Sequence, residues 1–383
     1  MRGLKIYSIG CVVSTRLEMI KMAPVIFQLC MCSWAKVYLI CNSMPQRLLK
    51  EILDLFNLNT DFDLNFIKFN HSTEQHKETL FIKLDSLIKK QHLDVLLAAG
   101  NSTSAFFSSL VAFHQQIPFG HIVTGLQHSN NNFLTRTVNR ILTDTLSTWN
   151  FVSTNTEKEQ LSQEDIQSNK IFITGNTGVD AVQWILKNKP DRNHYGYLQN
   201  LIITTVNQYP HFEGNLHNIC SAILSLSNNF DDLNFIVTAH ANKKVQQELS
   251  KFMSNQPHIH LLPLLSYDEF IHLMQRAILI LTDSENVQEE ASALHKPVLI
   301  LRSSTEKAEI VAEGLGLLVG TSKKEIIKNV NALLTDGKRY LKLTQCPSPY
   351  GDGHAAERIA EILKKSLLHK NKSISTHFNS ENH

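Results

Sequence analysis

The chain has 383 residues, 43% of them hydrophobic and 19% charged, a composition that predicts a globular protein with a buried core and excludes disordered and collagen-like architectures. At about 100–200 residues per domain, this length predicts two domains. Its 37 Lys and Arg nearly balance its 35 Asp and Glu, so the net charge of +2 excludes a general attraction to nucleic acid or to an anionic membrane.

The six cysteines form no C-x-x-C pair, and three lie in apolar runs near the N-terminus, which predicts buried, reduced thiols. No Cys/His set has the spacing of a zinc site, so we expect neither a metal nor a cofactor. The apolar stretch Met1–Val13 is followed at once by Arg16, Glu18 and Lys21, which indicates a strand entering a helix instead of a signal peptide. No window is long and apolar enough to span a membrane, and we expect a cytoplasmic protein.

Apolar runs alternate with helical patterns through the first half of the chain. The predicted strands are Leu4–Val13, Lys36–Cys41, Asp94–Ala99 and Phe119–Val123, and the predicted helices are Glu18–Cys32, Gln46–Phe56 and Ser104–Gln115. This repeated βαβ order predicts a parallel sheet with helices on both faces. The polar segment Ser129–Thr135 predicts a loop at the mouth of the sheet.

The same alternation returns in the second half of the chain. The predicted strands there are Asn200–Thr205, Asn234–Thr238, Ile259–Leu262, Ala277–Leu281 and Val298–Leu301, and the predicted helices are His217–Leu226, Lys244–Phe252, Tyr267–Met274, Val287–Ala293 and Ala355–Leu367. The fold class is therefore α/β, with two Rossmann-like domains facing a central cleft where ligands bind at the carboxyl ends of the strands. We predict domains at residues 1–175 and 176–350, a C-terminal helix at 351–368 packing back across them, and a polar tail at 369–383.

Several motifs follow one another along nearly the whole chain. They are S-T-R-L-E-M-I-K-M-A-P-V at Ser14–Val25, Q-Q-I-P at Gln115–Pro118, I-T-G-N-T at Ile173–Thr177, L-T-D-S at Leu281–Ser284, Q-E-E-A at Gln288–Ala291 and P-Y-G-D-G at Pro349–Gly353. In this order they resemble the non-hydrolysing UDP-N-acetylglucosamine 2-epimerase family, whose architecture is called GT-B. The resemblance implies inversion at C2 of UDP-GlcNAc to UDP-ManNAc, through loss and re-addition of UDP, and a homodimer.

The resemblance also implies a set of ligand-binding positions. They are Arg16, Lys21, Phe270, Ser284, Glu290 and Lys307. The basic residues suit a diphosphate, Ser284 can cap a helix N-terminus that favours anions, Glu290 corresponds to the acid for the ribose hydroxyls and Phe270 to an aromatic residue near uracil. Solvated positions on a helix remain the alternative for Arg16 and Lys21, and core packing remains the alternative for Phe270.

The chain departs from the family where the chemistry lies. The positions of the family's catalytic acids and histidine hold Asn101, Val123, Arg136, Thr137 and Val206. An amide cannot take up a proton and an isopropyl group has none to exchange, so ordinary acid-base catalysis at C2 is not expected from these residues. The family's S-G-G turn is Ser284-Glu285-Asn286 here, which brings side chains and a negative charge to a phosphate site.

His121, His128 and His240 are the remaining candidates for acid-base work near neutral pH, with a structural role as the alternative for His121. Three functions therefore stay open. The first is an active UDP-GlcNAc 2-epimerase with an unusual residue set. The second is an inactive paralogue that binds a UDP-sugar or a partner protein, and the third is another nucleotide-sugar enzyme of GT-B architecture, such as a glycosyltransferase.

Overall fold

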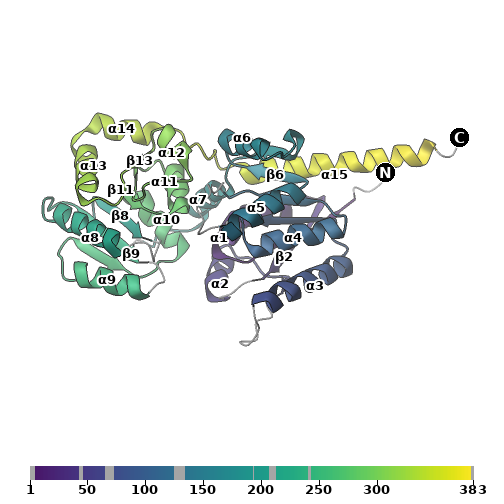
Figure 1. The fold of residues 1–383 in the computed structure, drawn as a ribbon, viewed down its shortest axis with the longest axis horizontal. Coiled ribbons are helices and arrows are strands. Elements are labelled where there is room, and N and C mark those ends of the chain that lie inside the picture. Colours follow the sequence, from purple (N-terminus) through teal and green to yellow (C-terminus); the bar gives the residue numbers. More distant parts are fainter. Residues whose placement is uncertain are drawn as a thin grey trace. The chain divides into compact units, whose positions relative to one another are not determined.

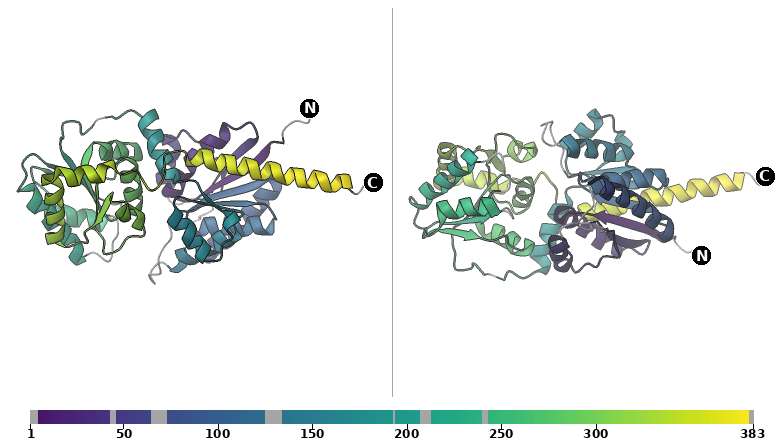
Figure 2. Two further views of the ribbon diagram at one scale, coloured as in Figure 1. Left: turned by 90° about the horizontal axis from the view of Figure 1, so that it is seen from above. Right: turned by 60° about the horizontal axis from the view of Figure 1, so that its bottom comes forward.

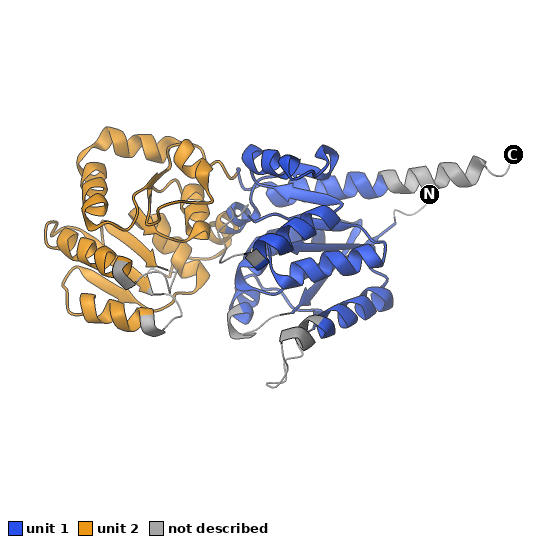
Figure 3. Ribbon diagram, in the orientation of Figure 1, with its two compact units in different colours: residues 1–181, 351–383 blue, residues 182–350 orange. Residues whose placement is uncertain are grey.

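The computed structural model describes residues 5–42, 46–64, 73–124, 134–192, 194–206, 213–239 and 243–380. The chain divides into two compact units, residues 1–181 with 351–383 (unit 1) and residues 182–350 (unit 2) (Figure 3). Each unit contains a parallel sheet with helices, which confirms the predicted α/β class with two Rossmann-like domains (Figure 1). The division falls after Ala181, a few residues beyond the predicted boundary at 175.

Within its described residues, unit 1 has a seven-stranded parallel sheet of order β3-β2-β1-β4-β5-β6-β7. The strands are β1 (Tyr7–Val13), β2 (Ala35–Cys41), β3 (Phe62–Asp63), β4 (Val95–Ala99), β5 (Phe119–Ile122), β6 (Trp149–Val152) and β7 (Ile171–Ile173). The strand order reverses between β1 and β4, and this is the switch point beside which open α/β sheets bind ligands. β1, β4, β5 and β6 are almost wholly buried, as parallel strands covered on both faces must be.

Helices cover both faces of this sheet. They are α1 (Arg16–Cys30), α2 (Gln46–Leu55), α3 (Thr73–Gln91), α4 (Thr103–His114), α5 (Leu134–Leu146), α6 (Asn155–Gln163), a 3-10 turn (Ser168–Lys170), the first part of α7 (Thr177–Asn188) and α15 (Ala355–Ser380). α3, α4 and α5 lie side by side on one face (Figure 1). α1 packs against α2 and α15 on the other, because the crossovers change face where the strand order reverses (Figure 2).

Unit 2 repeats the plan with a six-stranded parallel sheet of order β10-β9-β8-β11-β12-β13 in its described residues. Its strands are β8 (Leu201–Val206), β9 (Asn234–Ala239), β10 (Ile259–Leu262), β11 (Ala277–Thr282), β12 (Val298–Ile300) and β13 (Gly316–Leu318). Its helices are α8 (Glu213–Ser227), α9 (Lys243–Met253), α10 (Tyr267–Arg276), α11 (Glu285–Ala293), α12 (Ala308–Ala312), α13 (Lys323–Thr335) and α14 (Gly337–Gln345). The switch point lies between β8 and β11.

The predicted elements differ from the observed ones mainly at their ends and by omission. No predicted element corresponds to the helices α3, α5, α6, α7, α12, α13 and α14 or to the short strands β3 and β13. α15 extends beyond Leu367, where the sequence predicted its end. Of the loop predicted at 129–135, residues 129–133 lie outside the described residues, and Leu134 already begins α5.

Candidate functional site

The turn between β1 and α1 is organised around a buried carboxyl group. Thr15 caps α1 by accepting a hydrogen bond from the backbone N–H of Glu18, and Glu18 accepts in return from the N–H groups of Ser14 and Thr15 and from the Ser14 hydroxyl. Burial raises the pKa of Glu18, and these hydrogen bonds partly offset the rise. The capping box thus engages the acid that lies at the carboxyl end of β1.

Arg16 and Lys21 extend from the first turns of α1. Arg16 is half-buried, and its Nη2 lies 3.2 Å from Oε1 of Glu51 on α2. Lys21 is buried, and its Cε approaches the backbone of Gly178, where a Cβ would lie 3.7 Å away, at the start of α7. Neither residue is therefore a solvated position on the helix, and contact with a ligand stays a prediction for both.

Asn101 follows β4 through a left-handed turn. Gly100 has φ +83°, a conformation that side chains rarely adopt, and its N–H donates to the carbonyl of Ile122 on β5. Ser102 then caps α4 by accepting from the N–H of Ala105. Asn101 is half-buried between these two anchored residues, at the carboxyl end of the strand beside the switch point.

Val123, directly after β5, is a core residue. It is 3% exposed and packs in an apolar cluster with Val152, Leu161, Ile166 and Ile171. Its own N–H donates to the carbonyl of Phe151. The position that the resemblance assigns to a catalytic acid therefore belongs to the hydrophobic interior of unit 1.

The first turn of α5 carries the other two altered acid positions. Arg136 is exposed and Thr137 is half-buried. A guanidinium stays protonated throughout the usable pH range, and an alcohol is a very weak acid, so this pair supplies no proton transfer near neutral pH. The structure describes nothing of residues 125–133, which include His128.

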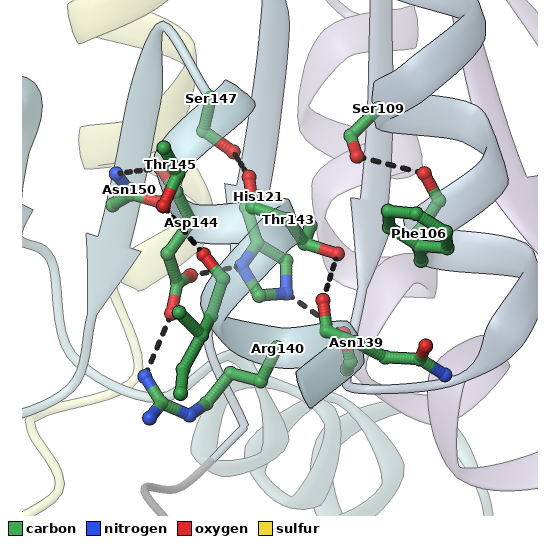
Figure 4. Close-up of polar contacts among 12 residues, drawn as sticks. Phe106, Ser109, His121, Asn139, Arg140, Thr143, Asp144, Thr145, Ser147 and Asn150 are labelled. Atoms are coloured by element: carbon green, nitrogen blue, oxygen red, sulfur yellow. Dashed lines mark hydrogen bonds and ion pairs between the residues drawn. The ribbon is translucent and has the colours of Figure 1, made fainter. Parts of the chain in front are cut away.

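His121 lies inside unit 1, where both of its ring nitrogens face oxygen atoms. Nε2 lies 2.8 Å from the carbonyl oxygen of Gly100, and Nδ1 lies 2.6 Å from Oδ1 of Asp144 on α5 (Figure 4). Arg140 donates to the other oxygen of Asp144 and also to both oxygens of Glu164. The ring is held by these contacts, so the structure agrees with the structural alternative for His121 and offers no exposed nitrogen for catalysis.

In unit 2, the end of β8 is also packed into the core. Val206 is 3% exposed and belongs to the apolar cluster of this unit, together with residues such as Ile202 and Leu216. Next to it, the hydroxyl groups of Thr205 and Thr282 form a buried hydrogen bond of 2.6 Å between β8 and β11. Neither group titrates near neutral pH. His240 and the segment 207–212 lie outside the described residues.

The N-terminus of α11 has its own negatively charged group. Ser284 stands at the N-cap, as predicted, but its side chain makes no capping hydrogen bond; instead its N–H donates to Thr282. Glu285 is the first residue of the helix, and its Oε1 lies 2.6 Å from Nη1 of Arg302. Burial raises the pKa of the Glu306 carboxyl to about 8, and the negative charge of Glu285 and a hydrogen bond with Glu285 contribute to the rise.

Three further predicted ligand positions lie around α10 and α11. Glu290 is buried, and the Tyr267 hydroxyl donates to its Oε1 at 2.8 Å. Phe270 is half-buried and lies on the same side of α10 as Tyr267, one turn later, so it is not a pure core residue. Lys307 is 3% exposed, forms an ion pair with Glu289 and approaches the ring of Tyr350. Its ammonium group is thus engaged inside unit 2.

Sequence reasoning did not find several residues that organise these regions. Asp144 and Arg140 share one face of α5 at i, i+4 spacing, a signal that was readable but typical of many helices. No sequence pattern indicated the roles of Tyr267 and Arg302 or the raised pKa of Glu306. Their contacts join different helices and loops of unit 2.

None of the helices in the described ranges is long and apolar enough to cross a membrane. Within the same ranges, no three His, Cys, Asp or Glu side chains are grouped so that they could hold a metal ion.

The fold defines an α/β protein of two units, each with a doubly wound parallel sheet, and comparison with known proteins identifies its family. A sequence profile described as UDP-N-acetylglucosamine 2-epimerase matches residues 33–364. The chain is 34% identical to the UDP-N-acetylglucosamine 2-epimerase of Neisseria meningitidis serogroup A over 367 residues, covering 93% of this chain and 98% of that protein. It is 33% identical to the Bacillus subtilis (strain 168) enzyme over 367 residues, with 95% and 96% covered.

A solved structure agrees with these relatives. The crystal structure of the Neisseria meningitidis UDP-GlcNAc 2-epimerase bound to UDP-GlcNAc matches with a TM-score of 0.85 and 32% identity, covering 94% of this chain and all of that one. The chain therefore belongs to the UDP-N-acetylglucosamine 2-epimerase family.

Proposed function

We propose that this protein binds UDP-GlcNAc or a similar UDP-sugar without carrying out ordinary epimerisation at C2. The observation that carries the proposal is the burial of Val123, which stands where the resemblance places a family acid and lies among four other apolar side chains. A carboxyl group at this position would lie among apolar side chains, and an isopropyl group supplies no acid or base. Asn101 stands at a second such position, and its amide cannot act as a general acid or base near neutral pH.

Epimerisation at C2 requires acid and base groups that these residues do not supply. Removing the proton at C2 and returning one on the other face requires positioned acid and base groups, and each such group typically contributes about 10²- to 10⁴-fold. Two titratable groups at the carboxyl edge of unit 1, Glu18 and His121, are engaged in the α1 cap and in the contact with Asp144.

Binding is supported by different residues. The Neisseria relative was solved with UDP-GlcNAc bound, and this chain keeps an acid at Glu290 and an aromatic residue at Phe270, as the resemblance requires for the nucleoside. Glu290 is held by Tyr267, which restricts the orientations of its carboxylate. We therefore expect the uridine end of the ligand to be recognised more strongly than the diphosphate, which meets Glu285 at the start of α11.

The test combines binding with isotope exchange. Calorimetry should detect binding of UDP and UDP-GlcNAc to the purified full chain, and Glu290→Gln should weaken both. Proton NMR of UDP-GlcNAc in heavy water should show no loss of the C2 proton, under conditions in which the Bacillus subtilis relative exchanges it.

The two halves of the proposal fail separately. Exchange at a rate within about tenfold of the relative would refute the loss of epimerisation. Absence of any heat or thermal shift with millimolar UDP would refute nucleotide binding, since a ligand specific for the folded state must raise the melting temperature.

A further inference from the structure

A chain of hydrogen bonds in unit 1 leads from α6 to the turn that presents Asn101. Glu164, at the end of α6, receives two bonds of 2.7 Å from Arg140, and Arg140 also donates to Asp144 at 2.9 Å. Asp144 contacts His121 on β5, and His121 contacts the carbonyl of Gly100 (Figure 4). Arg140, Asp144 and His121 are almost fully buried, so this network has little access to water.

The two bonds of His121 fix the direction of its ring. A carbonyl oxygen can only accept, so Nε2 donates to Gly100, while Nδ1 faces Oδ1 of Asp144. Rotating the ring by half a turn would place C–H groups against both oxygens. Because Asp144 also receives a bond from Arg140, the carboxylate that orients the ring is itself held in place.

The bond to Gly100 controls the next residue through covalent geometry. The carbonyl of Gly100 and the N–H of Asn101 belong to one planar peptide unit, so fixing the oxygen fixes the direction of that N–H and restricts the Asn101 side chain. The N–H of Gly100 is tied to the same strand through Ile122, 3.1 Å away. Gly100 has no side chain to limit its backbone, so its conformation depends on these two contacts with β5.

We propose that His121 is a positioning residue that sets the orientation of Asn101 toward the sugar of a bound UDP-sugar. The inference rests on the proposed function for its ligand. Asn101 lies at the carboxyl end of β4 beside the switch point, where α/β sheets bind ligands, and its amide offers both a donor and an acceptor for sugar hydroxyl and acetamido groups. Asp144, Arg140 and Glu164 act on Asn101 only through His121.

Two substitutions separate the bonds of His121. The amide nitrogen of Gln is as many bonds from Cβ as Nε2 of His, so His121→Gln keeps the donor to Gly100 and loses the bond to Asp144. The amide nitrogen of Asn corresponds to Nδ1, so His121→Asn keeps the bond to Asp144 and loses the one to Gly100. If His121 were only a structural support, His121→Gln would be the more harmful change, because it removes a bond to a buried charge.

If His121 positions Asn101, His121→Asn should instead be the more harmful of the two changes at the turn formed by Gly100 and Asn101. By hydrogen exchange of the unliganded protein, the amides of Asn101–Thr103 should exchange about tenfold faster in His121→Asn than in His121→Gln, a ratio that corresponds to a lost hydrogen bond. UDP-GlcNAc should bind about fivefold more weakly to His121→Asn and within twofold of wild type to His121→Gln. Binding of UDP, which lacks the sugar, should be unchanged in both variants.

Equal exchange at these amides in the two variants, or equal loss of UDP and UDP-GlcNAc affinity, would overturn the inference. If His121→Asn does not fold, the wild-type protein still tests the inference. The ¹⁵N resonances of the His121 ring should shift on addition of UDP-GlcNAc and stay in place with UDP. Identical responses to the two ligands would overturn the inference. A wild-type protein that binds neither ligand would refute the proposed function, and the exchange comparison would still test whether His121 holds the turn.

Discussion

The carboxyl edges of the two sheets differ in how their side chains are packed and paired. In unit 1, Val123 is core and Asn101 stands in a turn whose Gly100 carbonyl contacts His121, whereas Arg136 at the start of α5 is exposed. In unit 2, Val206 is likewise core, but the start of α11 holds charged groups that are matched with each other, as in the ion pair of Glu285 with Arg302. Burial and the nearby charge of Glu285 raise the pKa of Glu306 to about 8.

This difference separates a change in packing from a change in charge. A buried apolar side chain is retained by its neighbours, so returning a carboxylate to its position costs stability before it can contribute chemistry. A charged residue at a half-exposed helix end is balanced by one or two partners, so a single substitution can alter ligand affinity without disturbing the core. A carboxylate returned to the core of unit 1 should therefore mainly lower stability, whereas a charge removed at the start of α11 in unit 2 should mainly change ligand affinity.

The largest effect is expected when a carboxylate is returned to position 123. Val123→Glu should lower the free energy of unfolding by about 3–5 kcal/mol, the cost of an uncompensated charge in the interior. The uncharged control Val123→Thr should lose about 1–3 kcal/mol, because only a hydroxyl is buried. Urea unfolding measures both. If Val123→Glu were as stable as wild type, position 123 would have access to solvent. Packing would then not distinguish this position of unit 1 from the start of α11 in unit 2.

A smaller effect is expected at the start of α11. Glu285→Gln removes the negative charge from the first residue of the helix and releases Arg302 from its ion pair, and both changes favour a diphosphate. Two like charges at about 4 Å repel by about 1 kcal/mol or more, so UDP affinity should rise about 5- to 10-fold by calorimetry.

The binding of uridine, which has no phosphate, should not change in Glu285→Gln. Glu325→Gln is the matched control, because it removes a similar charge from the first turn of α13 in the same unit. An equal gain in both variants would point to the overall charge of the protein, and no gain in either would show that the diphosphate does not meet Glu285.

The proton on Glu306 predicts a dependence of stability on pH. The pKa of this carboxyl is raised from 4.5 to about 8, so between these values the folded state holds a proton that the unfolded state has lost, and stability falls as the pH rises through this window. Glu306→Gln should remove that decline and raise the melting temperature at pH 8 by about 2–4 °C relative to wild type, after allowance for the partial exposure of the group.

The same comparison at pH 4 provides the control for Glu306→Gln, because both states of the wild-type carboxyl are then largely protonated. Melting curves of the two proteins should converge there. Parallel curves from pH 4 to pH 8 would mean that the interaction of Glu306 with Glu285 is not formed in solution.

The smallest effect is expected from Asn101→Asp. The change is nearly isosteric and restores one family acid, but residues that act as a unit do not recover activity one at a time. The C2 proton of UDP-GlcNAc should still be retained in heavy water, and UDP affinity should stay within about twofold, since the diphosphate is not expected to contact this side chain. Exchange in this single variant would show that the rest of the catalytic machinery is present.

Most strands and the longer amphipathic helices were predictable because their signals are local. Tyr7–Val13 and Val95–Ala99 are apolar runs that can only be buried, and Thr15 with Glu18 forms a capping box that needs no distant partner. The same local patterns did not predict α3 or α6, whose polar residues outnumber the apolar ones that reach the core.

The sequence by itself determined the family and the doubly wound plan of each unit, and it predicted which residues stand where the resemblance places catalytic acids, since motif order and hydrophobic periodicity are written along the chain. Only the tertiary structure decided what those residues do. It placed Val123 in a core cluster, engaged His121 between Gly100 and Asp144, and matched Glu285 with Arg302. Burial and the pairing of charges depend on segments far apart in the chain, and a linear pattern does not contain that information.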